Sequence, residues 1–290
     1  MNPKLSLALG ILFISFSPIF VRLAGVPPIT SAFYRIFIAF ICLAPYCIIK
    51  QKLKIKRNEL LIALTGGIVF GLDIFVWNIS LFKIAATVST LIANLAPVWV
   101  GLISYLLFKI NSGRFYWLGT VIAIGGMVVL VGLESLLKLQ LNSGVLLAVL
   151  ASVFYAIYIL ITKGILQKIE MLTFMFYSML SASVFLLAIC LIEQDNLTEF
   201  SNQAWLYLAG LGIICQLAGW LTINFSLKFL PSPKVSVALL SQTVIAGVWA
   251  TLLLHEKLQL KEIIGSLVVL VGIGITFLKA NTIKRSPETV

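Results

Sequence analysis

The chain has 290 residues, of which 61% are hydrophobic and 11% are charged, and its formal net charge at pH 7 is +11. So little charge cannot cover the surface of a soluble protein of this length, which excludes a soluble globular domain. The basic residues lie in short segments between long apolar runs, as membrane topology requires, so we do not expect the chain to bind nucleic acid.

The apolar runs are long enough to cross a bilayer, which takes about 20 residues in a helix. Each run must satisfy its backbone hydrogen bonds internally, and the alternating segments of a transmembrane barrel are absent from the sequence. The pattern therefore predicts an all-α integral membrane protein. We expect ten spans, at residues 5–24, 30–49, 60–82, 86–107, 115–133, 143–163, 172–192, 203–226, 234–254 and 260–278.

The distribution of lysine and arginine predicts the orientation of these spans. Fifteen of the 21 basic residues lie on the side of the N-terminus, five lie on the other side, and Arg35 lies within a span. Because positive charge is retained on the cytoplasmic side, we expect both termini in the cytoplasm. The predicted location is the inner or plasma membrane of the cell, with many passes through it.

A weak internal repeat relates the two halves of the chain. A shift of 146 residues places Asn78-Ile-Ser-Leu81 on Asn224-Phe-Ser-Leu227, and it also superimposes several glycines. We expect a first five-helix repeat at residues 1–136 and a second at 137–290. Five is an odd number, so the two copies enter the membrane from opposite sides. Such inverted repeats are typical of secondary transporters that work by alternating access.

Several short motifs extend this picture. The fourth span contains Ala96-Pro97-Val98, and the ninth ends in Leu253-Leu254-His255-Glu256-Lys257-Leu258, followed by Ile264-Gly265-Ser266 and Val271-Gly272-Ile273. With its ten spans and its basic loop after the second, the chain resembles the EamA-type family of the drug/metabolite transporter superfamily. The resemblance implies a two-repeat helical fold and the export of metabolites such as amino acids. Ile110 stands where the repeat would place Glu256, and Thr243 where it would place Pro97, so symmetric roles for that acid and proline are not expected.

Two charged residues lie within spans. Asp73 lies near the middle of the third span, where a carboxylate costs about 2.5–3.5 kcal/mol or more to insert. It is our candidate for proton coupling or for contact with a substrate amine. Arg35 lies in the second span and can bind a substrate carboxylate or phosphate bidentately. The alternatives are a structural ion pair between Asp73 and Arg35, a helix-packing role for Asp73, and extension of Arg35 toward the membrane surface.

The fourth span presents one polar stripe, Thr87, Thr90, Asn94, Pro97 and Gly101, at intervals of three and four residues. Those intervals place all five on one helical face. We predict that Asn94 faces a cavity and that Pro97 is a hinge, because proline frees a backbone carbonyl and kinks a helix. Small residues are also what packed membrane helices use for close approach, so simple packing is the alternative.

Aromatic and amide residues at similar depth complete the candidate substrate site, because small-molecule sites combine such groups with a few charges. Beside Arg35, Asp73 and Asn94, the candidates are Trp77, Tyr155, Tyr158, Gln216, Trp220 and Gln242. For each of these residues a core or interfacial role is the alternative. Four glycines at seven-residue intervals on the fifth and tenth spans, Gly119, Gly126, Gly265 and Gly272, predict tight helix–helix packing. His255 and Glu256 are expected to cap or join helices at the outer end of the ninth span.

The sequence therefore favours a secondary active transporter that exports a small metabolite such as an amino acid. A proton-coupled importer or exchanger of another organic solute is the alternative. A channel fits an inverted repeat less well, and a membrane-embedded enzyme would need a cluster of catalytic groups that this sequence lacks. We expect no cofactor, no metal and no catalytic residue. The partners are a small-molecule substrate, the bilayer and, for the coupled mechanism, protons, in a monomer or homodimer.

Overall fold

The computed structural model describes residues 2–84, 86–109, 112–132, 142–254 and 259–278. These residues are almost entirely helical, and no strand occurs among them. The helices are, in chain order, α1 (Pro3–Ile14), α2 (Ser17–Ala24), α3 (Pro28–Ile49), α4 (Arg57–Lys83), α5 (Ala86–Ala93), α6 (Ala96–Phe108), α7 (Gly113–Val131), α9 (Ser143–Ile165), α10 (Met171–Ile192), α11 (Asn202–Gly210), the π-helix η1 (Leu211–Gly219), α12 (Trp220–Phe229), α13 (Ser232–Ala238), α14 (Ser241–Leu254) and α15 (Leu260–Phe277).

Within those ranges, ten helical stretches are long and apolar enough to cross a membrane. This confirms the prediction of ten spans. Large apolar side chains cover the outside of the bundle, where lipid replaces water; Ile192 is 77% exposed and Leu107 is 73% exposed. The protein is thus a multi-pass, all-α membrane protein.

Helix ends are fixed by local side-chain bonds in several places. The Asn2 side chain caps α1 by accepting from the Lys4 amide at 2.9 Å. Asn142 caps α9 in the same way, accepting from the amides of Gly144 and Val145. Gln259 and Glu262 form a reciprocal capping box at the start of α15. These bonds satisfy backbone donors that a helix end otherwise leaves without partners.

Three spans are broken near their middle. The first span breaks between α1 and α2, the fourth between α5 and α6 at Asn94–Leu95, and the ninth between α13 and α14 at Leu239–Leu240. Pro97 lies in the first turn of α6, a position that proline favours because its missing N–H would be unpaired there anyway. The break in the ninth span falls within one residue of the place that the 146-residue shift predicts, although no proline occupies it.

The eighth span departs from regular helix. Its central nine residues, Leu211–Gly219, form a π-helix between α11 and α12. The corresponding third span, α4, is an ordinary α-helix of 27 residues. A π-helical insertion is rare and often coincides with a functional site, because the extra residue per turn redirects the side chains that follow.

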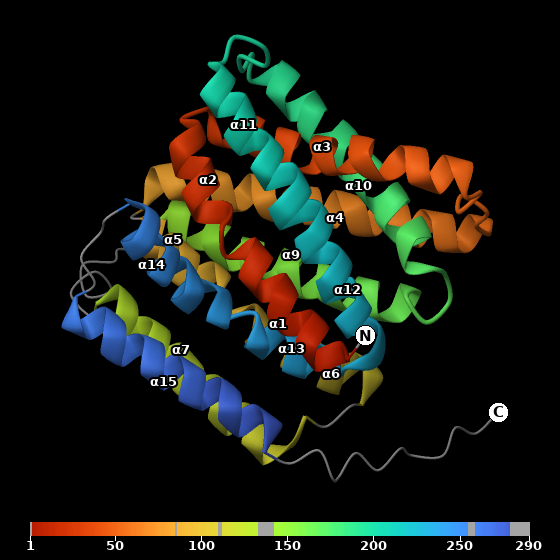
Figure 1. Cartoon of the computed structure of the whole chain (residues 1–290). Helices are drawn as coiled ribbons and strands as arrows, with labels where there is room; N and C mark the ends of the chain where they lie inside the picture. Colours follow the sequence, from red (N-terminus) through yellow and green to blue (C-terminus); the bar gives the residue numbers. More distant parts are fainter. Residues whose placement is uncertain (1, 85, 110–111, 133–141, 255–258, 279–290) are drawn as a thin grey trace, which may run out of the picture.

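The two halves of the chain are interleaved (Figure 1). The first span of each half packs against the third span of the other half: α9 lies along α4, and α1 lies along η1 and α12. The second spans, α3 and α10, pack against each other, as do the last spans, α7 and α15. Any site enclosed between first, second and third spans is therefore built from both halves.

The α7–α15 pair lies side by side along one edge of the bundle (Figure 1). A Cβ atom on Gly126 would lie 2.6 Å from the Val269 nitrogen and 2.8 Å from the Gly265 carbonyl oxygen. A Cβ atom on Gly119 would lie 2.5 Å from the Gly272 carbonyl oxygen. The predicted tight packing of these four glycines is confirmed, because only glycine lets the two backbones approach so closely.

Some expectations concern residues that the structure does not describe. His255 and Glu256, together with the Lys257-Leu258 part of their motif, lie outside the described residues, as does Ile110. The side chains of Thr87 and Thr90 also lie outside the described part of the chain. The predicted roles of these residues stay predictions.

Candidate functional site

Arg35 occupies the interior of α3 and makes its hydrogen bonds with neutral groups. Its Nε donates to Oε1 of Gln216 at 2.9 Å, and its Nη1 donates to Oγ of Ser17 at 3.2 Å. Gln216 is 1% exposed and belongs to η1, whereas Ser17 begins α2 just after the break in the first span. Two irregular segments, one from each half, thus fix the guanidinium group.

Asp73 lies on α4, and its carboxylate makes no hydrogen bond or ion pair with another described residue. The charges of Asp73 and Arg35 interact across the interior, but no ion pair within 4.0 Å joins these two residues. A structural Asp73–Arg35 ion pair, one of the alternatives considered above, is therefore not present. Arg35 does not reach outward either, because Gln216 and Ser17 hold it inside the bundle.

Asp73, Arg35 and Tyr155 share an unusual environment. Helices enclose all three, and the ionisable group of each lies inside the bundle although the residue as a whole is only partly buried. Tyr155 also lies close enough to both charged groups for its hydroxyl to interact with them.

Aromatic rings form a wall beside these polar groups. Trp220, at the start of α12, makes edge-to-face contacts with Tyr158 at 5.2 Å and Tyr155 at 6.3 Å between ring centroids. Phe70, one turn before Asp73 on α4, stacks on Tyr158 at 4.5 Å and meets Trp220 at 5.1 Å. These geometries are favourable for aromatic pairs and hold the wall rigid. The hydroxyl of Tyr158 points among Thr162, Ser178 and Asn224.

Two indole N–H groups of the predicted site have no hydrogen-bond partner. Nε1 of Trp77 and Nε1 of Trp220 are both buried and unpaired. An unpaired buried donor costs about 1–3 kcal/mol, so such groups are uncommon in folded proteins. Trp77 lies one turn beyond Asp73 on α4, and Trp220 belongs to the aromatic wall. Both indoles therefore keep an unused hydrogen-bond donor.

Asn94 and Pro97 lie at a different contact, between the fourth and ninth spans. Nδ2 of Asn94 donates to Oγ1 of Thr243 at 3.4 Å, and the side chain is 9% exposed. The Pro97 carbonyl accepts a hydrogen bond from the Tyr116 hydroxyl of α7. The helix is broken beside Pro97 as predicted, but movement about this break stays a prediction.

The structure joins most, though not all, of the candidates. Described contacts or charge interactions connect Arg35, Asp73, Tyr155, Tyr158, Gln216 and Trp220. No described side-chain contact brings Gln242, which lies in the first turn of α14, to this group. Asn94 contacts Thr243 instead, and Trp77 is related to the group only by its place on α4.

Two members of the group, Ser17 and Phe70, are not among the residues predicted from the sequence. The adjacent Pro18 was an available signal for Ser17, because a proline within an apolar span marks a break and frees neighbouring polar groups. Phe70 carries no such signal, since an isolated phenylalanine in an apolar span is ordinary.

Chemically, this arrangement presents a guanidinium group and a carboxyl group that are not paired with each other. An aromatic surface lies beside them, and it includes Trp220 with its unpaired N–H donor. Groups of these kinds bind an amphipathic solute with charges of both signs and fix its orientation.

Known proteins resemble this chain in sequence and in fold. The model of the EamA-like transporter family matches residues 4–132 and again residues 142–278. The uncharacterized transporter YdfC of Bacillus subtilis is 23% identical over 281 residues, which cover 97% of this chain and 92% of that protein. An uncharacterized transporter of Archaeoglobus fulgidus is 26% identical over 285 residues, which cover 96% of this chain and 100% of the relative.

Of two further matches, one covers only about half of the chain and the other shows only the fold. A protein named as the S-adenosylmethionine uptake transporter of Rickettsia prowazekii is 25% identical over 147 residues, which cover 51% of this chain and 49% of that protein. A crystal structure superimposes with a TM-score of 0.82 and 17% identity, covering 96% of this chain and 97% of the other, which shows a shared fold. Since the family model matches both halves of the sequence, the chain belongs to the EamA-like transporter family of the drug/metabolite transporter superfamily.

Proposed function

We propose that this transporter is a secondary carrier of small zwitterionic metabolites, such as amino acids, and that it exports them. The observation that carries the proposal is the unpaired carboxylate of Asp73 beside an Arg35 held by the neutral groups of Gln216 and Ser17. Neither charge neutralises the other through a direct bond. Both are therefore free to bind the opposite charges of one solute.

The proposed roles follow from the chemistry of each group. An arginine has five N–H donors in a planar fork that matches a carboxylate, and the bonds to Gln216 and Ser17 leave donors free. Asp73 receives the ammonium group of the solute. The aromatic wall of Tyr155, Tyr158 and Trp220 accommodates the apolar part, and an aromatic face also attracts a cation.

Alternating access is supported by the interleaving of the two halves. Arg35 and Asp73 belong to the first half, whereas Gln216, Tyr155 and Trp220 belong to the second. If residues 1–136 and 137–290 move as inverted repeats, their relative rocking separates the two sets of ligands and releases the solute. The breaks at Asn94–Leu95 and Leu239–Leu240 are the proposed hinges, with Pro97 next to the first. We place both termini in the cytoplasm, because positive charge predominates on that side.

A proton-coupled mechanism is the second candidate, and the same carboxylate favours it. A carboxyl group without a fixed counter-ion can alternate between solute and proton as the site opens to each side. The direction of transport is then set by the gradients rather than by the fold. The relative named for S-adenosylmethionine uptake adds that compound to the test panel, since it too carries an amino-acid group.

Reconstitution into liposomes of defined lumenal content tests the proposal. Vesicles loaded with each unlabelled amino acid or S-adenosylmethionine are diluted into a trace of the labelled compound, and exchange is measured over time. We expect saturable exchange for a small set of zwitterions and none for the corresponding amino-acid amides or N-acetyl derivatives. Equal rates for zwitterions and blocked derivatives would exclude the proposed pairing of charges.

A lumenal pH dye in the same vesicles separates the two mechanisms. Proton coupling predicts a pH change inside the vesicles that requires substrate, together with accumulation driven by an imposed pH gradient. A carrier without coupling exchanges the same substrates with no pH change. Imposing the gradient in each direction in turn compares export with import.

A further inference from the structure

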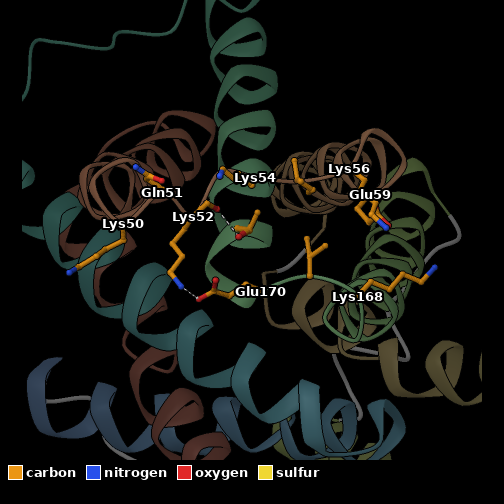
Figure 2. Close-up of a pocket in the computed structure, with 11 residues that line it drawn as sticks. Lys50, Gln51, Lys52, Lys54, Lys56, Glu59, Lys168 and Glu170 are labelled. Carbon is orange, nitrogen blue, oxygen red and sulfur yellow. Dashed lines mark hydrogen bonds and ion pairs between the residues drawn. The ribbon is translucent and has the colours of Figure 1, made fainter.

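A basic cleft lies at the end of the bundle where α3 ends and α10 begins (Figure 2). Its volume is about 460 Å³. One wall is the connection between α3 and α4, residues 50–56, and the other is the connection between α9 and α10, residues 166–170. Both connections lie at the ends of membrane spans, which is the depth of the lipid headgroups.

Positive charge dominates this cleft. Its lining includes the lysines at positions 50, 52, 54, 56 and 168 and only two acids, Glu59 and Glu170. Lys52 pairs with Glu170, with Nζ and Oε1 2.8 Å apart (Figure 2). The other four lysines form no ion pair with a described residue. The lining therefore has an excess of three positive charges, and four flexible ammonium groups are available to a ligand.

The walls of the cleft are held in place by hydrogen bonds to α10. Oγ1 of Thr173 donates to the Lys52 carbonyl at 2.7 Å, and the Tyr177 hydroxyl donates to the Leu53 carbonyl at 2.8 Å. These bonds fix the backbone of the lysine-rich connection, so its charges are concentrated before a ligand arrives. Such preorganisation reduces the entropy that binding costs.

Helix polarity adds to the positive potential. Both α4 and α10 begin at the cleft, and neither N-terminus has a side-chain cap. Helix N-termini carry partial positive charge and present unpaired N–H groups, which favour anions. The carboxylate of Glu170 reduces this effect at α10, so α4 contributes more.

We propose that this cleft binds a phosphate-bearing anion, supplied either by the headgroup of an anionic phospholipid or by a free phosphate compound. Concave basic sites between membrane helices suit such headgroups, and nearby lysines each strengthen the attraction. The cleft shares no residue with the proposed transport site. This inference therefore stands or fails independently of the transported solute.

The test uses the purified full chain in an uncharged detergent and measures thermal unfolding during titration. The probes are dihexanoyl phosphatidylglycerol, dihexanoyl phosphatidylcholine and sodium phosphate, with sodium chloride at matched ionic strength as the reference. A ligand that binds the folded state raises the unfolding midpoint. We expect stabilisation by phosphatidylglycerol beyond that by phosphatidylcholine. Additional stabilisation by sodium phosphate shows that free phosphate also binds, and its absence assigns the site to the lipid headgroup.

Matched variants show whether the cleft lysines cause the stabilisation by phosphatidylglycerol. Lys54→Gln combined with Lys168→Gln removes two cleft lysines and is expected to weaken phosphatidylglycerol binding by roughly 30-fold. Lys54→Arg with Lys168→Arg keeps the charges and should retain binding. Lys4→Gln with Lys228→Gln removes two exposed lysines at the same end but outside the cleft, and should weaken binding by less than about threefold.

Two results would overturn the proposal. One is equal weakening in the cleft and control pairs, which would mean that diffuse surface charge attracts the probe. The other is stabilisation of the wild type by phosphatidylcholine as large as that by phosphatidylglycerol, with no effect of phosphate, because binding would then depend on the acyl chains.

Discussion

The α7–α15 interface and the interior around Arg35 hold helices together by opposite means. Between α7 and α15, glycines bring two backbones into direct contact and leave no room for a side chain. Around Arg35, the helices are separated by long side chains, two of them charged, and a carboxylate and two indole N–H groups have no described partner. One region is close-packed, and the other keeps unused hydrogen-bonding capacity.

This difference distinguishes an interface that stabilises the fold from an interior that is suited to binding a solute. Close packing of small residues stabilises membrane helices where apolar burial against lipid cannot. Unpaired polar groups in the same environment are costly, so they persist where a ligand or water satisfies them. Added side-chain volume should therefore disturb the α7–α15 interface, whereas a change of charge should disturb the site around Arg35.

The largest effect is expected from the charges of the site. Asp73→Asn and Arg35→Gln should each lower exchange by about 100-fold, because removing one partner of an enclosed charge contact leaves the solute's opposite charge unpaired. Initial exchange rates in liposomes measure this, with thermal unfolding as a check on folding. Glu199→Gln and Lys228→Gln, which remove exposed charges outside the site, serve as controls. Wild-type rates in both site variants would contradict the zwitterion proposal.

The next effect concerns stability rather than transport. Gly126→Ala should destabilise the protein by about 1–3 kcal/mol, because the added methyl group meets the backbone of α15. Gly125 is the matched control, since a Cβ atom there has nothing within 4 Å. Gly125→Ala should be neutral or stabilising by up to about 1 kcal/mol through helix propensity. Thermal unfolding of the two variants compares them, and equal midpoints would show that the α7–α15 contact is looser than described.

A smaller effect should distinguish two glutamines. Gln216→Leu removes the acceptor for Nε of Arg35 and should lower exchange by about tenfold, since a hydrogen bond to a charged group contributes about 1.5–3 kcal/mol. Gln242→Leu makes the same chemical change at a residue with no described contact to the site. It should leave the rate and the apparent KM near the wild-type values. Equal losses in the two variants would place Gln242 in the site as well.

The smallest effect is expected at the Lys52–Glu170 ion pair, which lies near the surface. The hydrogen bond to Glu170 raises the pKa of Lys52 above its usual value of 10.5. The pair therefore contributes stability at pH values below about 10.5, and this contribution is lost as the pH rises through the raised pKa. The unfolding midpoints of wild type and Glu170→Gln should differ slightly at pH 8 and converge as the pH rises through the raised pKa of Lys52. Lys54→Gln is the control, and a constant difference at all pH values would contradict the assignment.

Much of the fold could be predicted because its causes are local. Apolar runs of sufficient length predicted ten spans, and glycines at seven-residue intervals predicted that α7 and α15 pack tightly, although not against which helix. Pro97 indicated the break beside it. The equivalent break at Leu239–Leu240 has no proline to mark it, and the π-helix at Leu211–Gly219 has no comparable signal, because both depend on how neighbouring helices pack.

In the candidate site, too, some features follow from the local sequence and others depend on tertiary packing. The sequence by itself determined the residue types available at mid-depth, since a charge or amide within an apolar span is visible from hydropathy alone. Only the tertiary structure decided that Arg35 bonds to Gln216 and Ser17 rather than to Asp73, and that Gln242 has no described contact with the group. The physical reason is that these partners lie 181 and 18 positions from Arg35 in the chain. Long-range packing of irregular helices, which leaves no periodic pattern in the sequence, brings them together.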